Sequence, residues 1–246
     1  MGIIIAVLLF SFIIIFHELG HFLLAKKNGI RVDEFSLGLG PTLLGKQIGE
    51  TKFSLKLLPF GGACMMGEDD ADDLSEGSFN SKSVWARMSV VAAGPIFNLI
   101  LACVFCFILI MITGYRSPEI TGVLDGYSAQ EEGLQAGDVI TEINGRNVHI
   151  WDDVSLYTMT HADEAPFKVE YERDGKKYTA KLEPRQLEGD AAPLLGVTSG
   201  DIVKPGIFKS VEYSIYKVKY WMNYTVDSLR MLVTGQAGLK DLSGPV

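Results

Sequence analysis

The chain has 246 residues, 48% of them hydrophobic, and a formal net charge of −8. Its mean hydropathy is positive although 21% of its residues are charged, so the apolar residues must be gathered in blocks. The acidic balance and the lack of a basic stripe in the sequence give no support to a nucleic-acid partner. The length is sufficient for a membrane core and one small soluble domain.

The first predicted element is a transmembrane helix over residues 1–25. Its apolar run would measure about 36 Å at 1.5 Å per residue, which is enough to cross a bilayer. A signal peptide is the alternative, but it would begin with basic residues, and the first lysine here is Lys26. The run also contains His17, Glu18 and His21, which are costly in lipid and therefore indicate a functional site.

Residues 26–87 form a loop that is rich in lysine and arginine, and such short loops stay cytoplasmic. Apolar residues alternate with polar ones in "VDEFSLGLGP" and in "TKFSLKLLPFGG", which predicts strands with one apolar face. We expect a small sheet that dips into the membrane boundary and whose edge could pair with an extended peptide. An ordinary amphipathic hairpin is the alternative.

A second transmembrane helix is predicted over residues 88–114, which carry no charged side chain between Arg87 and Arg116. The charge pattern then places the N-terminus and everything after Gly114 outside the cytoplasm. Cys103 and Cys106 form a C-x-x-C pair in this helix. Two small residues that pack in a lipid-buried helix explain the pair better than zinc binding or redox chemistry does.

The composition changes after the second helix. Residues 119–183 mix short apolar patches with Asp-Gly and Asn-Gly turns, which predicts a compact mixed domain with a hairpin across Asp174-Gly175. Farther along, apolar residues recur every three or four positions from Ile207 to Val233. This spacing predicts an amphipathic helix. Its charged residues make it too polar to span, so we expect it on the membrane surface or against the core.

The polar residues of the first helix form the pattern "HELGH". His17 and His21 are four residues apart, so a helix turns both imidazoles to one side, where they could bind one zinc ion. Glu18 would lie near the metal without ligating it, as a general base that later returns a proton to the leaving amine. Histidines packed without metal are the alternative, but the free-energy cost of burying these polar groups would then have no metal bond to offset it.

Five segments in order resemble the site-2 protease family of intramembrane zinc metalloproteases, most closely its PDZ-containing RseP-type members. They are "HELGH", "FSLGLGP", "LPFGG", "AAGPIFN" and "GLQAGDVITEINGRNV". The resemblance implies a membrane protein with an α-helical transmembrane core, a small membrane-associated β-sheet and one extracytoplasmic PDZ domain of mixed α/β structure. It places that domain at residues 115–200, followed by an amphipathic helix within 201–246 that leads to a third span.

The resemblance also implies roles for individual residues. Zn²⁺ would be bound by His17 and His21, with Glu18 as the catalytic group. Gly61 and Gly62 would lie in a turn where the backbone approaches substrate or metal, and Asn98 would face the catalytic region and position substrate. In "LLGV", Leu195 and Gly196 would hold the carboxylate of a peptide in the PDZ groove. A plain strand there and a simple helix–helix hydrogen bond for Asn98 are the alternatives.

The family takes its third zinc ligand from an aspartate in an "LDG" motif on a later span, and no apolar run long enough to be such a span follows residue 114 in this sequence. We therefore expect an N-terminal portion of a longer enzyme that is inactive by itself. The expected location is the bacterial inner membrane, with several spans and with the active site near the cytoplasmic side. The expected partners are the lipid bilayer, transmembrane substrates and a peptide at the PDZ groove.

The family suggests cleavage of a membrane-anchored anti-sigma factor, of leftover signal peptides, or of both. An inactive membrane-anchored PDZ binding protein is the main alternative. A metal transporter or zinc store is a weaker one, because the second span supplies only Asn98 and small hydroxyl groups.

Overall fold

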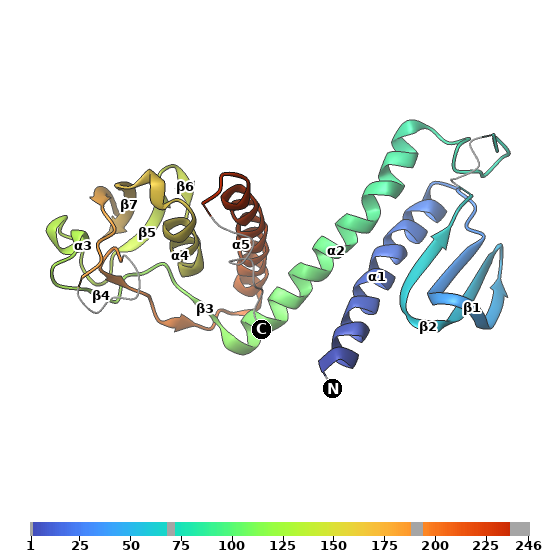
Figure 1. Ribbon diagram of the computed structural model, residues 1–246, viewed down its shortest axis with the longest axis horizontal. Coiled ribbons are helices and arrows are strands. Elements are labelled where there is room, and N and C mark those ends of the chain that lie inside the picture. The colour runs from blue at the N-terminus through green and yellow to red at the C-terminus, as the bar shows by residue number, and fades with distance from the viewer. Residues whose placement is uncertain (1, 68–71, 188–193, 237–246) are drawn as a thin grey trace. The chain divides into compact units, whose positions relative to one another are not determined.

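A computed structural model describes residues 2–67, 72–187 and 194–236. The chain forms two compact units that divide inside α2, between Ala102 and Cys103. In Figure 1 the first unit contains α1, the β1–β2 sheet and α2 as far as Ala102, and the second contains the rest of α2 and the remaining elements. The final "DLSGPV", which is predicted to precede a third span, lies outside the described residues.

The two predicted apolar helices are confirmed as α1, Gly2–Lys27, and α2, Val84–Thr113. Both are long and apolar enough to cross a membrane, as judged by length and composition. Helix α2 begins four residues before the predicted start because Ser83 caps it: its Oγ accepts the N–H of Ala86 at 3.3 Å. Such a cap satisfies a backbone donor that would otherwise lack a partner at the helix start.

The two helices approach each other closely at a pair of small residues. A Cβ added to Gly20 would lie 2.6 Å from the carbonyl oxygen of Ala93. Only glycine fits at that point, in the way that small residues allow close packing between membrane helices. This contact fixes the position along the two helices at which the polar side chains of α1 face α2.

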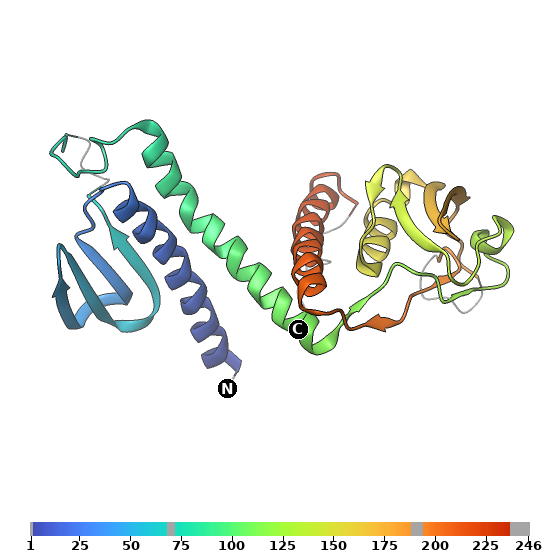
Figure 2. The same cartoon turned by 180° about the vertical axis from the view of Figure 1, so that it is seen from behind.

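The two predicted strands are confirmed as β1, Glu34–Ile48, and β2, Thr51–Met65, which form one long antiparallel hairpin. The hairpin is folded on itself, so that Phe35 pairs with both Phe53 and Cys64. Phe35 and Phe53 pack on Phe22 of α1, with ring centres 5.3 and 5.7 Å away. The sheet is therefore fixed to α1, and Figure 2 shows β2 running beside that helix.

The second unit has a four-stranded antiparallel sheet in the order β6-β5-β7-β8. The predicted hairpin across Asp174-Gly175 is confirmed, and both residues have positive φ, as does the Asn144-Gly145 pair. The strands are β5 Val139–Ile143, β6 Arg146–Asn147, β7 Phe167–Arg173 and β8 Lys176–Leu182. Two-residue strands make two further pairs: β3 Tyr115–Arg116 with β10 Ile202–Val203, and β4 Gly122–Val123 with β9 Val197–Thr198.

Three helical segments accompany this sheet: α3, Ser128–Glu131, α4, Trp151–Thr160, and the 3₁₀ turn η1, Ala162–Glu164. Their apolar side chains and those of the sheet form one core. Its fully buried members include Ile120, Ile140, Ile143, Phe167, Val169 and Leu182. This core makes the unit a compact mixed domain, as the turn pattern predicts.

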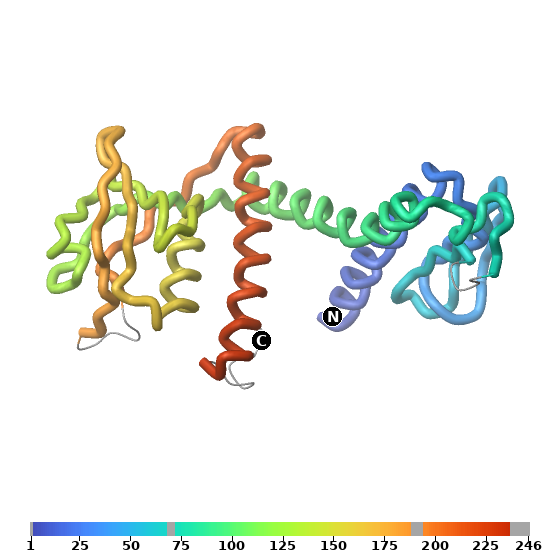
Figure 3. The backbone as a smooth tube through the Cα atoms, turned by 90° about the horizontal axis from the view of Figure 1, so that it is seen from above, coloured from blue at the N-terminus to red at the C-terminus, as the bar shows by residue number. Residues whose placement is uncertain are grey.

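The predicted amphipathic helix is confirmed as α5, Ile207–Val233, and it lies beside α4 in Figure 3. Of its predicted apolar stripe only Val218 is buried, and the other buried positions are polar. The exposed members of the stripe are Val211, Ile215, Met222, Val226, Leu229 and Val233. The helix is therefore held to its own unit through a largely polar face, and its apolar face points away.

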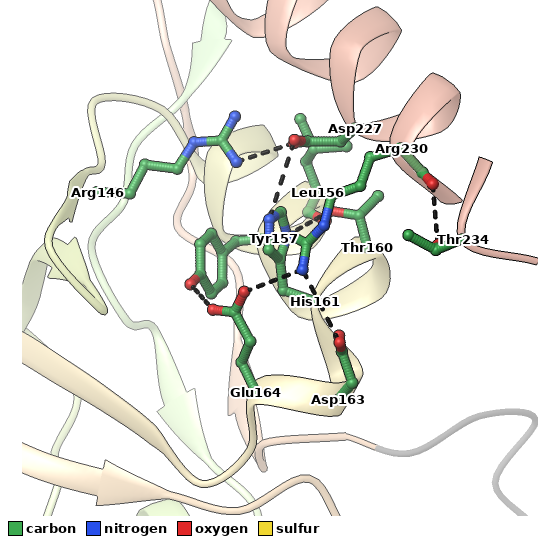
Figure 4. Close-up of polar contacts among 10 residues, drawn as sticks. All are labelled: Arg146, Leu156, Tyr157, Thr160, His161, Asp163, Glu164, Asp227, Arg230 and Thr234. Carbon is green, nitrogen blue, oxygen red and sulfur yellow. Dashed lines mark hydrogen bonds and ion pairs between the residues drawn. The ribbon is translucent and has the colours of Figure 1, made fainter. Parts of the chain in front are cut away.

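Charged groups fix that polar face in place. Arg146 Nη1 donates to Asp227 Oδ2 at 2.8 Å, and Lys217 Nζ donates to Asp152 Oδ1 at 2.8 Å. Figure 4 shows Arg146 and His161 both directed at Asp227. Since the Asp227 side chain is only 9% exposed, its charge is stabilised mainly by these partners.

Candidate active site

The "HELGH" residues lie on the second half of α1, where the helix is flanked by α2 and by the sheet. The four-residue spacing brings the rings of His17 and His21 to one side, with their centres 4.8 Å apart and nearly perpendicular. Two imidazoles on one tetrahedral zinc, with Zn–N distances of about 2.0–2.1 Å, would place the ring centres roughly 5 Å apart. The observed separation fits that arrangement.

Both Nε2 atoms point at the same spot on α2. A Cβ added to Gly94 would meet the Nε2 atoms of both His17 and His21. A side chain at this position would therefore occupy the space in front of the two nitrogens. Because Gly94 has none, that space stays open to a metal ion.

The other ring nitrogen of each histidine is held by α2. His21 Nδ1 lies 2.8 Å from the carbonyl oxygen of Val90, and His17 Nδ1 lies 3.2 Å from Nδ2 of Asn98. A carbonyl oxygen only accepts, so His21 carries its proton on Nδ1 and presents the lone pair of Nε2. Metal-binding histidines are typically oriented by such a second hydrogen bond.

The carboxylate of Glu18 is held by the sheet. The backbone N–H of Cys64 in β2 donates to Glu18 Oε2 at 3.0 Å, so β2 fixes one oxygen of the carboxylate. A cavity of about 250 Å³ adjoins the carboxylate, and it is lined by Glu18, His21, Cys64, Met66, Phe79, Val90 and Val91. This cavity could admit water to Glu18.

The donor set fits two positions of a zinc site. Across residues 2–67, 72–187 and 194–236, no cluster of three or more histidine, cysteine, aspartate or glutamate side chains could hold a metal ion. A catalytic zinc commonly has three protein ligands and one exchangeable position. The part of the chain that the structure describes therefore supplies the two imidazoles and the neighbouring carboxylate.

The glycines predicted near the site lie within β2, so the prediction that they form a turn is wrong. The strand passes beside α1 without reversing, because its pairing with β1 continues on both sides of them. Gly61 has a φ of +80°, and a Cβ on Gly62 would lie 3.7 Å from Cγ of Glu18. Gly62 thus adjoins the Glu18 carboxylate, whereas Asn98 contacts His17.

Leu195 and Gly196 belong to the second unit. There a groove of about 430 Å³ runs between α4 and the "LLGV" segment, and its lining includes Val154, Thr158, Leu194, Leu195 and Val197. Gly196 packs directly against Tyr127 and has a φ of +84°. The groove is predominantly apolar and open along one side of α4, which suits an extended peptide with apolar side chains.

Three contributors to the site were not predicted: the carbonyl of Val90, the open position at Gly94 and the N–H of Cys64. A signal for the first two is present in the sequence, because Val90, Gly94 and Asn98 recur every four residues and so share one face of a helix. The N–H of Cys64 has no such signal, since every residue except proline carries one.

An apolar helix with two converging imidazoles and an adjacent carboxylate defines the class of membrane zinc metalloprotease. Residues 5–246 match peptidase family M50, and the chain belongs to that family. This confirms the resemblance to the site-2 proteases. It also establishes the enzyme class, a zinc metalloendopeptidase, and the cofactor, Zn²⁺.

Individual relatives of the chain are also named as proteases. The chain is 38% identical over its whole length to a Clostridium acetobutylicum protein that bears the name of a zinc metalloprotease, and it covers 72% of that protein. It is 28% identical to the "Regulator of sigma-W protease RasP" of Bacillus subtilis, with 98% of this chain and 76% of that protein covered. A PDZ domain structure from Listeria monocytogenes covers 35% of this chain and 88% of its own, at 24% identity and a TM-score of 0.28.

Proposed function

We propose that His17 and His21 bind the catalytic zinc through Nε2 and that Glu18 is the general base and acid of an intramembrane endopeptidase. The observation that carries this assignment is the convergence of both Nε2 atoms in front of Gly94. The hydrogen bonds of the Nδ1 atoms with α2 keep the rings in this orientation. Zinc held there supplies a Lewis acid that activates water and polarises a peptide carbonyl.

Glu18 performs the proton transfers. Because Oε2 accepts the N–H of Cys64, Oε1 is the atom that takes the proton of the attacking water. The same atom then delivers that proton to the leaving nitrogen. The hydrogen bond to β2 keeps the carboxylate beside the histidines between the two transfers.

The substrate approaches along β2. Gly62 has no side chain to separate a substrate backbone from Glu18, and its strand adjoins α1. An extended segment of a transmembrane protein added to this sheet would bring its peptide bond toward the carboxylate. Gly61, Gly62 and Asn98 keep their predicted substrate-binding roles in this proposal.

The enzyme resides in a bacterial inner membrane as a protein with several spans. Lys26 and Lys27 in the last turn of α1 mark the cytoplasmic end, which places the active site near that side. The second unit, with a PDZ domain at residues 115–200, then faces outward. Its groove at Leu195 and Gly196 binds a peptide terminus and so selects substrates. The name of the Bacillus subtilis relative supports an anti-sigma factor as one substrate, and leftover signal peptides are a second class.

The deciding experiment is Glu18→Gln in the full-length enzyme, with a transmembrane reporter in membranes. Cleavage should fall about 10²- to 10⁴-fold, the usual contribution of a general acid–base group, while bound zinc is unchanged. Glu34→Gln is the matched control, because Glu34 bonds to Ser54 in the sheet and not to the site. Cleavage at the normal rate by the Glu18 variant would exclude this role.

A further inference from the structure

Asn98 is in an unusual position for a polar residue of an apolar helix. Its Nδ2 faces Nδ1 of His17 at 3.2 Å. Its Oδ1 is buried and has no hydrogen-bond partner anywhere in the described segments 2–67, 72–187 and 194–236. A buried acceptor without a partner requires a physical explanation.

The arrangement conflicts with zinc binding by His17. If Nε2 of a neutral imidazole is to bind a metal, the proton must be on Nδ1. An Nδ1–H and an amide NH₂ are both donors and cannot bond to each other. If Nδ1 instead accepted from the amide, the proton would be on Nε2, and it would block the nitrogen that points at Gly94.

Rotation of the Asn98 amide removes the conflict at His17 and gives Oδ1 a partner, while the NH₂ group takes the place that Oδ1 occupies. The two ends of an asparagine amide are nearly the same size and exchange when χ2 turns by 180°. We propose, on the basis of the zinc site assigned above, that Oδ1 of Asn98 accepts the Nδ1–H of His17 and fixes that histidine in its metal-binding tautomer. Asn98 is then a positioning residue for the zinc ligand.

The same device is already present at the other histidine. The carbonyl of Val90 holds Nδ1 of His21 at 2.8 Å, and Asn98 follows Val90 by two helical turns on the same face of α2. Gly94 lies midway between them and faces both Nε2 atoms. Helix α2 thus provides one acceptor for each histidine and an open space between the two.

The two acceptors differ in one respect that makes the proposal testable. The acceptor at His21 belongs to the backbone and persists through substitution, whereas the acceptor at His17 is a side chain. Asn98→Leu removes the acceptor with little change in volume, and Asn98→Asp keeps an acceptor. Asn28→Leu is the matched control, since Asn28 also links α1 to α2, through Ser89 at 3.1 Å, but does not touch the histidines.

The first readout is the histidine tautomer in the zinc-free chain, measured by ¹⁵N NMR in detergent at pH 8, where an ordinary imidazole is neutral. The chain has four histidines, so each signal can be assigned by single substitution. We expect His17 to carry its proton on Nδ1 in the wild type, in Asn98→Asp and in Asn28→Leu. In Asn98→Leu the proton should move wholly or partly to Nε2. A wild-type His17 protonated on Nε2 would overturn the proposal, and so would an unchanged tautomer in Asn98→Leu.

The second readout is zinc affinity, measured by competition with a chelating dye. Asn98→Leu should weaken it about 10- to 100-fold, as is typical when the partner of a ligating histidine is lost, and Asn98→Asp should restore it. If His17→Ala loses zinc while Asn98→Leu does not, the positioning role fails and the zinc site stands. If His17→Ala binds zinc normally, the zinc site fails, and the tautomer measurement still decides what Asn98 does to His17.

Discussion

The four histidines of this chain divide into two pairs, and the pairs are used in opposite ways. In the first unit His17 and His21 have each Nδ1 in a contact with α2 and each Nε2 directed at an open space. In the second unit His149 and His161 are stacked face to face on tyrosines, with interplanar angles of 8° and 5°. The first pair presents its nitrogens, and the second pair presents its ring faces.

The polar environment of the second pair explains its structural role. His161 Nδ1 lies 2.8 Å from Oγ1 of Thr160, and its Nε2 faces Asp227 at 3.9 Å. Burial, together with the charge of Lys219, holds the pKa of His149 below its ordinary value, which favours the neutral ring that stacks on Tyr216. A histidine becomes a metal ligand only where the fold leaves a nitrogen lone pair facing empty space.

The largest effect is expected from removing a member of the first pair. His17→Ala should lose bound zinc, because one imidazole cannot hold the metal alone in the described site. His149→Ala and His161→Ala should retain it, and metal analysis of the purified protein in mild detergent would show the difference. Loss of zinc in His149→Ala or in His161→Ala would contradict the assignment of the zinc site to the first unit.

The ion pair between Arg173 and Asp138 should decide the stability of the second unit. Asp138 is 1% exposed and receives two hydrogen bonds from Arg173, at 2.6 and 2.7 Å. Arg173→Ala would leave that carboxylate buried and unpaired, at a cost of about 3–5 kcal/mol. Hydrogen exchange of the β5 and β7 amides measures this loss in the free energy of unfolding within the second unit.

Zinc content serves as the control for Arg173→Ala. It should stay normal if destabilising the second unit leaves the zinc site of the first unit intact. Arg185→Ala is the matched substitution, since Arg185 pairs with Glu131 at an exposed site, where an ion pair contributes little. Equal destabilisation by the two variants would contradict the argument from burial.

The open space in front of the first pair can be filled by one methyl group. Gly94→Ala would place a Cβ against both Nε2 atoms and should weaken zinc binding about 10- to 100-fold, the range found when ligand orientation is disturbed. Gly2→Ala is the control, because a Cβ there meets nothing within 4 Å. Unchanged affinity in the Gly94 variant would show that the metal is held elsewhere.

The smallest effect is a dependence of stability on acid pH in the second unit. Burial raises the pKa of Asp138, but the hydrogen bonds from Arg173 and from the N–H of Gln135 outweigh it, and the net pKa is lowered from 3.8. A carboxylate with a lowered folded-state pKa stabilises the fold above its unfolded pKa and loses that contribution as the pH falls below it.

Exchange protection of β5 and β7 should therefore be constant from pH 7 to about pH 4 and decline below that. Asp138→Asn should be less stable at neutral pH and should show a weaker decline. A variant as acid-sensitive as the wild type would mean that other carboxylates govern the effect.

Much of this organisation follows from local sequence patterns. Unbroken apolar runs specify α1 and α2, the alternation around Phe35 and Phe53 specifies the sheet, and Asp174-Gly175 specifies a hairpin turn because glycine and aspartate tolerate positive φ. The i, i+4 spacing of His17 and His21 places both on one side of a helix whatever surrounds it. These features depend only on neighbours in the chain.

The face that α5 turns toward its own unit shows where such patterns fail. Apolar periodicity predicts a stripe that includes Val211 and Ile215, yet these side chains are exposed while Ser214 and Asp227 are buried. Periodicity identifies which residues share a face, but not which face has a partner. Here the ion pairs of Asp227 and Lys217 select the polar face.

The sequence by itself determined the helices, the sheet, the zinc-binding motif and the enzyme family. Only the tertiary structure decided how the motif is completed: the carbonyl of Val90, the amide of Asn98 and the N–H of Cys64 reach α1 from positions 69, 81 and 46 residues away. Contacts at such separations are set by how helices and sheet pack, which local periodicity does not encode. The protonation of the histidines and the orientation of Glu18 therefore depend on the assembled fold, although the residues themselves can be read from the chain.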